Sequence, residues 1–115
     1  MEQIQVTATL PKIAPGDLAE FKRLAAQLLE RTKGEAGALQ YDWFLSADET
    51  KCVVRETYED SDAVLAHMAN VGELLGKLAE LGGGLEIEGF GPVSPQLAEA
   101  AAALHPTLYG FFQGK

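Results

Sequence analysis

The sequence predicts an α+β domain with a ferredoxin-like βαββαβ order, in which an antiparallel sheet carries its helices on one face. Two observations support this prediction. Segments with strand and helix periodicity follow one another as strand, helix, strand, strand, helix, strand, and stretches containing glycine or proline separate them. The 115 residues contain no repeat, linker or low-complexity segment, so a single domain is expected over residues 1–115.

The first strand and the first helix have the clearest periodicity. From Gln3 to Leu10, apolar residues alternate with Gln and Thr, which is typical of a strand with one buried face. Asp17 and Glu20 have the spacing of a helix capping pair, and apolar residues then recur at helical spacing until Gly34. A strand followed by an amphipathic helix is therefore expected.

Residues 38–60 predict a β-hairpin whose turn is the polar sequence SADET. Tyr41 and Trp43 share one face of its first strand, and the second strand places Arg55 and Glu56 on opposite faces. Because polar and apolar side chains occur on both faces, both faces are expected to be covered. Helices cover only one face of such a sheet. A second copy of the chain is expected on the other, which predicts a homodimer.

The second helix is expected to begin with Asp60 or Ser61 as its cap, to break or bend near Gly72, and to end at the glycine run 82–84. Residues 85–93 then predict a fourth strand.

The C-terminal part, from about residue 94, predicts a short helix with Ser94 as its cap and Pro95 at its first position. The aromatic tail after it is expected to be irregular and to pack on the partner subunit or over the end of the barrel.

Composition limits the classes of partner. Nine Lys and Arg residues against 17 Asp and Glu give a net charge of −8, which disfavours nucleic acid and anionic membrane surfaces. The single cysteine, Cys52, excludes an internal disulfide, and no apolar stretch approaches the roughly 20 residues that span a bilayer. The N-terminus has no secretory signal pattern. A soluble protein of the reducing cytoplasm is expected.

Three segments together carry a resemblance to a known family. GALQYDWFLS is a glycine followed by an aromatic-rich strand, and VVRETYEDSDAVLAHMAN ends a strand with Glu56, Tyr58 and Asp60 before a helix that carries His67. These patterns, together with the late segment FGPVSPQLAEAAAAL, resemble the antibiotic biosynthesis monooxygenase domain family. That family includes small quinol monooxygenases and haem-degrading oxygenases. The resemblance covers essentially the whole chain and implies a dimeric α+β barrel.

The resemblance has two departures. Where well-understood oxygenases of the family carry an Asn and, four residues later, a Trp on the third strand, this chain has Val54 and Tyr58. Where a haem-degrading member carries an axial His one residue beyond His67, this chain has Met68. Haem degradation is therefore not implied, and no cofactor is expected.

Five residues are candidate site residues. His67, which titrates near neutral pH, is the candidate base, and Tyr58 is the candidate hydrogen-bond donor. Tyr41, Trp43 and Asn70 are the candidate substrate-binding residues. The alternative for His67 is a buried histidine bonded to a backbone carbonyl or to Glu56, and the alternative for the two aromatic residues is a core or interface position.

A metal site is not expected, because the second histidine, His105, is far along the chain and Cys52 lacks a partner at metal-binding spacing. Two function classes remain. One is a cofactor-independent monooxygenase that acts on a phenolic, quinol or polyketide-like aromatic small molecule. The other is a non-catalytic dimeric module that binds a small molecule or stabilises a partner on the same fold. Whether the chain is an enzyme stays open between them.

Overall fold

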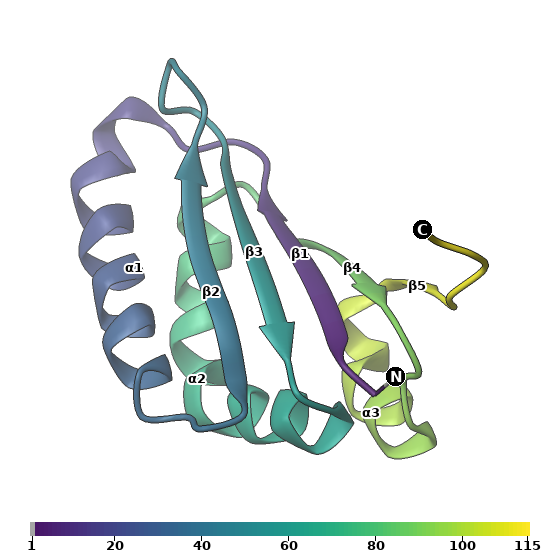
Figure 1. The fold of residues 1–115 in the computed structure, drawn as a ribbon. Coiled ribbons are helices and arrows are strands. Elements are labelled where there is room, and N and C mark those ends of the chain that lie inside the picture. The colour runs from purple at the N-terminus through teal and green to yellow at the C-terminus, as the bar shows by residue number, and fades with distance from the viewer. Residues whose placement is uncertain (1) are drawn as a thin grey trace.

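The computed structural model describes residues 2–115 and contains one five-stranded sheet in the order β2-β3-β1-β4-β5 (Figure 1). The strands are β1 (Ile4–Leu10), β2 (Ala38–Leu45), β3 (Cys52–Tyr58), β4 (Glu86–Phe90) and β5 (Thr107–Tyr109). The helices are α1 (Leu18–Thr32), α2 (Ser61–Leu81) and α3 (Pro95–Ala101), with the 3-10 turns η1 (Pro15–Asp17) and η2 (Ala102–Leu104). The predicted α+β, ferredoxin-like fold is confirmed.

The fifth strand corrects the prediction that the tail is irregular throughout. The four strands β1 to β4 pair antiparallel, but Thr107–Tyr109 pair in parallel with Glu88–Phe90. His105 adopts the left-handed conformation (φ 50°) after η2, and the chain then runs beside β4. The ring of Tyr109 stacks on Phe90 with centroids 5.0 Å apart. A strand of three residues is too short for its alternation to be recognised in the sequence.

Two of the three expected helix caps are confirmed. The Asp60 carboxylate accepts a hydrogen bond from the Ala63 amide at 2.9 Å, and Ser94 accepts one from the Leu97 amide at 3.1 Å. The prediction for Asp17 is wrong, because its side chain makes no capping hydrogen bond. Asp17 ends the η1 turn with helical backbone angles rather than the extended angles of a typical cap residue.

Helix α2 is continuous from Ser61 to Leu81, which corrects the predicted break near Gly72. A glycine costs about 1 kcal/mol relative to alanine inside a helix. Packing of the buried side of α2, through Val64, Val71 and Leu78 among others, outweighs that cost over 21 residues.

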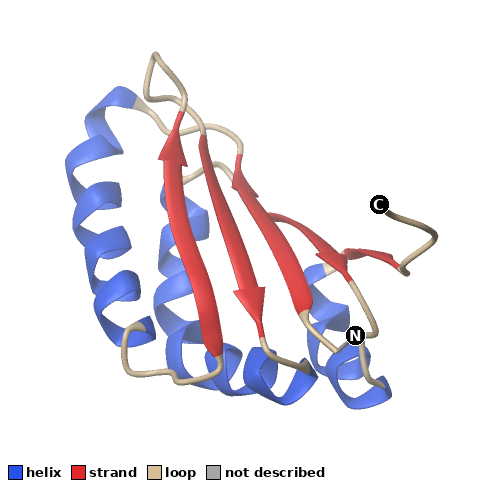
Figure 2. Cartoon of the chain, in the orientation of Figure 1, coloured by secondary structure: helices blue, strands red, loops and turns tan. Residues whose placement is uncertain are grey.

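All three helices lie behind the same face of the sheet (Figure 2). The core forms where inward-pointing strand residues meet the apolar stripes of the helices. Its buried members include Ile4, Ala8, Leu10, Cys52, Val54 and Tyr58 from the strands, and Phe21, Leu28, Val71, Leu74, Leu78 and Leu97 from the helices.

Within residues 2–115, the opposite face of the sheet carries no helix (Figure 2). Tyr41 and Trp43 point toward the helices and pack against the core, so these two aromatic residues do not lie on the open face. The open face instead mixes Thr, Gln and charged residues with Val53 and the exposed rings of Phe44 and Phe90. Polar and apolar groups thus occur on both faces, as expected. The open face has fewer aromatic residues than the face that the helices cover.

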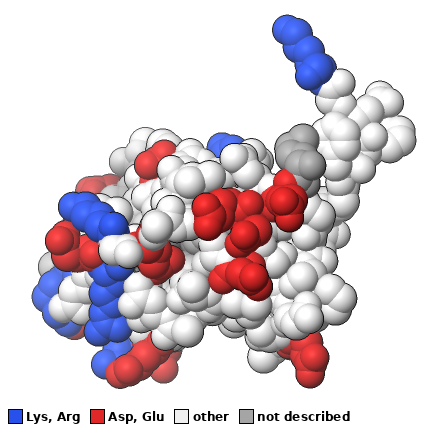
Figure 3. All heavy atoms as spheres, turned by 60° about the horizontal axis from the view of Figure 1, so that its bottom comes forward, with Lys and Arg blue, Asp and Glu red and all other residues white. Residues whose placement is uncertain are grey.

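Charge is unevenly spread over the surface. Carboxylates gather in the centre of the face shown in Figure 3, next to a broad uncharged area. Glu2, Asp60 and Asp62 line one shallow hollow at the start of α2. None of the helices within residues 2–115 combines the length and the hydrophobicity that a membrane crossing requires.

Candidate active site

A cavity of about 80 Å³ lies between the inner face of the sheet and helices α2 and α3. Small residues leave room for this space, since Ala8, Gly89, Ala98 and Ala101 are among the residues that line its walls. The other apolar wall residues include Val6, Val54 and Ile87 from the strands, Val64 and Met68 from α2, and Leu97, Leu104 and Leu108 from the C-terminal part. The cavity is therefore apolar over most of its surface.

Three polar side chains, those of Tyr41, Glu56 and His67, line the cavity among these apolar walls. They come from three different elements: β2, β3 and α2. Glu56 and His67 are buried, with relative exposures of 8% and 6%. An apolar cavity with a few convergent polar groups is the usual form of a small-molecule site.

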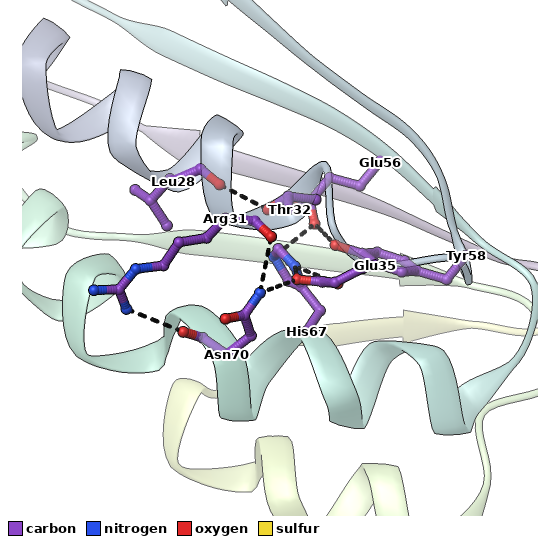
Figure 4. Close-up of polar contacts among 8 residues, drawn as sticks. All are labelled: Leu28, Arg31, Thr32, Glu35, Glu56, Tyr58, His67 and Asn70. Atoms are coloured by element: carbon purple, nitrogen blue, oxygen red, sulfur yellow. Dashed lines mark hydrogen bonds and ion pairs between the residues drawn. The ribbon is translucent and has the colours of Figure 1, made fainter.

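The imidazole of His67 is held in place by a carboxylate and two rings. Its Nδ1 atom lies 3.1 Å from each carboxylate oxygen of Glu35, which belongs to the connection between α1 and β2 (Figure 4). The ring also packs against the rings of Tyr41 and Tyr58, with centroids 5.0 Å and 5.3 Å away. These contacts leave Nε2 as the ring nitrogen that faces Glu56, at 3.9 Å from its Oε1 atom.

Glu35 is itself anchored by the middle of α2 and the end of α1. Asn70 of α2 donates a hydrogen bond to its Oε2 atom at 2.7 Å and another to the Arg31 carbonyl at 3.1 Å. The Arg31 side chain donates in return to the Asn70 carbonyl at 3.2 Å (Figure 4). Asn70 thus joins α1 to α2 at the position where Glu35 contacts His67.

Burial raises the pKa of Glu56 to about 7, with a further increase from the nearby carboxylate of Glu35 and a decrease from the hydrogen bond of Tyr58. The Tyr58 hydroxyl donates that hydrogen bond to Glu56 Oε1 at 2.5 Å. A carboxyl group with this pKa is partly protonated at neutral pH. Glu56 can therefore donate a proton as well as accept one.

Burial favours the uncharged forms of His67, Tyr41 and Tyr58. Burial lowers the pKa of His67, although the Glu35 carboxylate acts in the opposite direction. Burial also raises the pKa of Tyr41 and of Tyr58, and the charge of Glu56 raises both further. With its Nδ1 atom directed at the Glu35 carboxylate, neutral His67 donates its proton there and keeps a lone pair on Nε2, so it can act as a base toward a ligand.

The structure brings four of the five predicted site residues into one region. His67 and Tyr41 line the cavity. Tyr58 lies behind Glu56 and reaches the site through its hydrogen bond, and Asn70 reaches it through Glu35. Trp43 does not line the cavity; it packs edge-on against Tyr41, with ring centroids 5.5 Å apart. Within residues 2–115, the Trp43 Nε1 atom is buried without a hydrogen-bond partner.

Sequence reasoning missed Glu35 and did not include Glu56 among the site residues. Glu56 had a detectable signal, because an acidic residue takes an inward position between Val54 and Tyr58 of a strand. The expected pairing of Glu56 with His67 is not a hydrogen bond, because Nε2 of His67 and Oε1 of Glu56 lie 3.9 Å apart. Glu35 lies in a loop that has no periodicity, so no pattern singled it out.

The described part of the chain, residues 2–115, has no group of three or more His, Cys, Asp or Glu side chains arranged to hold a metal ion. The thiol of Cys52 is buried in β3, and burial raises its pKa to about 11. A thiol with this pKa remains protonated near neutral pH and is a poor nucleophile.

The fold and the sequence are similar to those of known proteins. A family model described as antibiotic biosynthesis monooxygenase matches residues 4–72, which is more than half of the chain. The chain belongs to the antibiotic biosynthesis monooxygenase family. The match ends within α2, so α3 and β5 lie outside the segment that the family model matches. No curated protein matches the sequence significantly.

Solved structures extend the similarity to the C-terminal part. MupZ from Pseudomonas fluorescens is 24% identical, with a TM-score of 0.83 over 100% of this chain and 94% of that one. A candidate antibiotic biosynthesis monooxygenase from Caulobacter crescentus is 27% identical, with a TM-score of 0.63 over 76% and 87% of the two chains. Rv0793 from Mycobacterium tuberculosis is 21% identical, with a TM-score of 0.70 over 81% and 97%.

Proposed function

We propose that this protein is a cofactor-independent monooxygenase that acts on a phenolic, quinol or polyketide-like aromatic small molecule. The observation that carries the proposal is the position of His67, whose Nδ1 atom contacts the Glu35 carboxylate while the residue lines an apolar cavity. Membership of the monooxygenase family supports the reaction class.

In this reaction the substrate supplies the electrons. His67 removes a proton from the substrate, and the resulting electron-rich anion reacts with dioxygen inside the apolar cavity. One oxygen atom enters the product, and the other leaves as water when a CH₂ group becomes a carbonyl. Tyr41 contacts the ligand directly, whereas Tyr58 acts through Glu56 and Asn70 acts through Glu35.

The cavity limits the size of the ligand. Its volume of about 80 Å³ is below the roughly 300 Å³ at which ligand pockets usually begin. An aromatic substrate therefore places only its reacting part beside His67. The remainder extends toward the wall formed by α3, η2 and β5, where Ala101, Leu104 and Leu108 lie.

We further infer that the protein is a cytoplasmic homodimer. Support for dimerisation comes from the open sheet face with its exposed Phe44 and Phe90, and from a family that is usually dimeric. The free Cys52 supports a reducing compartment.

Oxygen uptake with a panel of hydroquinones and anthrones tests the function. We expect turnover in air, incorporation of one atom of labelled dioxygen, and loss of both in His67→Gln. The side chain of His105 is exposed and does not itself line the cavity, although its neighbours Leu104 and Pro106 do, so His105→Gln is the matched control and is expected to keep activity. A folded His67→Gln protein that still consumes oxygen would exclude His67 as the base.

The second candidate function is a non-catalytic dimeric module that binds a small molecule or stabilises a partner. The small volume of the cavity favours it, since a site of about 80 Å³ leaves little room for a complete aromatic substrate. If ligands from the same panel raise the melting temperature without any oxygen uptake, the module is the better description.

A further inference from the structure

Two carboxylates flank the one imidazole of the site. Glu35 contacts Nδ1 of His67 at 3.1 Å, and Glu56 lies 3.9 Å from Nε2. Neither carboxylate has a Lys or Arg partner within residues 2–115, because the nearby Arg31 side chain bonds to the Asn70 carbonyl instead. A buried carboxyl group without a cation retains a proton in preference to carrying charge.

The cluster of Glu35, His67 and Glu56 therefore holds one proton, which can be bound either by the Glu56 carboxyl group or by Nε2 of His67. In the resting arrangement the proton is on Glu56, because burial raises the pKa of this carboxyl group to about 7, although the hydrogen bond donated by Tyr58 lowers it. Neutral His67 is then free to accept a second proton at Nε2, because Glu35 stabilises the imidazolium that forms. An acid and a base thus lie side by side on the wall of one apolar cavity.

We propose that this pair catalyses keto–enol tautomerisation of a neutral, apolar ketone that carries an acidic α-hydrogen, without any oxidant. His67 Nε2 takes the proton from the α-carbon while the Glu56 carboxyl gives its proton to the carbonyl oxygen. The C–H electron pair becomes the C=C bond, the C=O π pair becomes the O–H bond, and the product is the enol. His67 then gives its proton to water and Glu56 takes one from water, which restores the resting state, because the 3.9 Å between Nε2 and Oε1 is too long for a direct transfer.

The surroundings select a neutral substrate. The cavity walls are largely aliphatic, and the second carboxylate, Glu35, would repel an anion near His67. The chain as a whole carries a net charge of −8, which also disfavours anionic ligands. Because both steps of the tautomerisation exchange protons with the enzyme, no ionic form of the substrate accumulates.

This inference rests on the proposed function in taking the cavity as the substrate site and His67 as the base, but it does not require dioxygen. Deprotonation of this enol would give the electron-rich anion that the proposed oxygenation consumes. Tautomerisation would thus be the first half of the proposed reaction and would also proceed alone under nitrogen.

The test is anaerobic exchange of α-hydrogens in deuterated buffer, followed by proton NMR. Cyclohexanone and 2-tetralone serve as one-ring and two-ring probes. We expect the wild-type protein to accelerate loss of the α-hydrogen signal above the buffer rate, and Glu56→Gln and His67→Gln each to slow the protein-dependent part about 100-fold. Glu73→Gln makes the same chemical change as Glu56→Gln on an exposed side chain of α2 and is expected to match the wild type.

The wild-type rate compared with the buffer rate does not depend on any variant being folded, and no acceleration with either probe overturns the inference. Folded Glu56→Gln that exchanges at the wild-type rate overturns it as well, because the acid is then not Glu56. Oxygen uptake is measured separately. Anaerobic exchange without oxygen uptake supports the inference and contradicts the monooxygenase, whereas oxygen uptake without exchange does the opposite.

Discussion

The Nδ1 atom of His67 lies 3.1 Å from both carboxylate oxygens of Glu35, although the two residues are 32 positions apart in the chain. This contact decides which ring nitrogen carries the proton. A carboxylate accepts only, so neutral His67 must hold its proton on Nδ1 and present an unprotonated Nε2 to the cavity side. The basicity of the site thus depends on a loop residue that does not line the cavity.

The first prediction concerns this tautomer. Nitrogen-15 NMR of labelled histidine is expected to show neutral His67 protonated on Nδ1. Glu35→Ala removes the acceptor and should shift the proton to Nε2, where Glu56 can accept it. Glu35→Gln keeps a carbonyl acceptor for Nδ1 and should retain the wild-type tautomer. His105 in the same spectrum is the internal reference, and a wild-type His67 protonated on Nε2 contradicts the prediction.

The second prediction is a pH dependence of stability. The pKa of Glu56 rises from 4.5 to about 7 on burial, so the folded protein binds more protons than the unfolded chain between these values. Its contribution to stability is present below pH 4.5 and decreases as the pH rises toward 7. The lowered pKa of His67 acts in the opposite direction, because there the unfolded chain binds more protons.

Glu56→Gln isolates the first effect. Relative to the wild type, this variant is expected to gain on the order of 2 kcal/mol in unfolding free energy as the pH rises from 4.5 to about 7, since one pKa unit corresponds to about 1.4 kcal/mol. Urea unfolding of both proteins at a series of pH values measures the difference. A difference that is constant with pH would mean that Glu56 is ionised throughout in the folded protein.

The sequence predicted the parts of the site that depend on local periodicity. The alternation of β3 predicted which strand residues share a face, and the helical spacing of α2 placed His67 on or beside its apolar stripe; the structure shows that Glu56 faces inward and that His67 is buried. Glu35 could not be predicted as a site residue, because its contact with His67 depends on how the end of α1 packs against α2. The turn at His105 before β5 could likewise not be predicted, because it depends on a single residue in the left-handed backbone conformation.

The third prediction uses the unequal caps of the two long helices. Asp60→Ala is expected to lower the unfolding free energy by about 1 kcal/mol, because the Ala63 amide loses its acceptor. Asp17→Ala makes the same change where no capping hydrogen bond exists, and its effect should stay within about 0.5 kcal/mol. Chemical denaturation measures both. Equal losses in the two variants would show that the Asp60 hydrogen bond contributes nothing specific.

The fourth prediction addresses the open face of the sheet. Phe44 is 55% exposed in the single chain, on the face that has no helix. If a second copy covers this face, Phe44→Asp should convert a dimer into a monomer, as seen by sedimentation at micromolar concentration. Leu29→Asp, on the helical side, is the control and should leave the dimer intact.

The same experiment in high salt tests the force that holds the copies together. Burial of Phe44, Val53 and Phe90 is insensitive to ionic strength, so the wild-type dimer should persist. A stable wild-type monomer at low salt contradicts dimerisation. A dimer that dissociates only at high salt would mean that interactions between charged residues hold the two copies together.

The last prediction separates two roles of the C-terminal tail. Thr107 to Tyr109 pair with β4, Tyr109 stacks on Phe90, and Leu108 forms part of the cavity wall. Phe111 and Phe112, in contrast, are 70% and 88% exposed in the single chain. Two neighbouring phenylalanines with so much exposed surface are typical of a contact with another molecule, and here we expect the partner subunit to bury them.

Two truncations distinguish these roles. Removal of residues 107–115 should lower the melting temperature and weaken ligand binding, because β4 loses its neighbour and the cavity loses Leu108. Removal of residues 111–115 alone leaves those contacts in place, so it should reduce only the affinity between subunits, measured by sedimentation over a range of concentrations. Gln113→Ala, a polar change in the same segment, is the control. If the shorter truncation leaves the dimer dissociation constant unchanged, the two phenylalanines do not contact the partner subunit, and the tail after Gly110 is a free terminus.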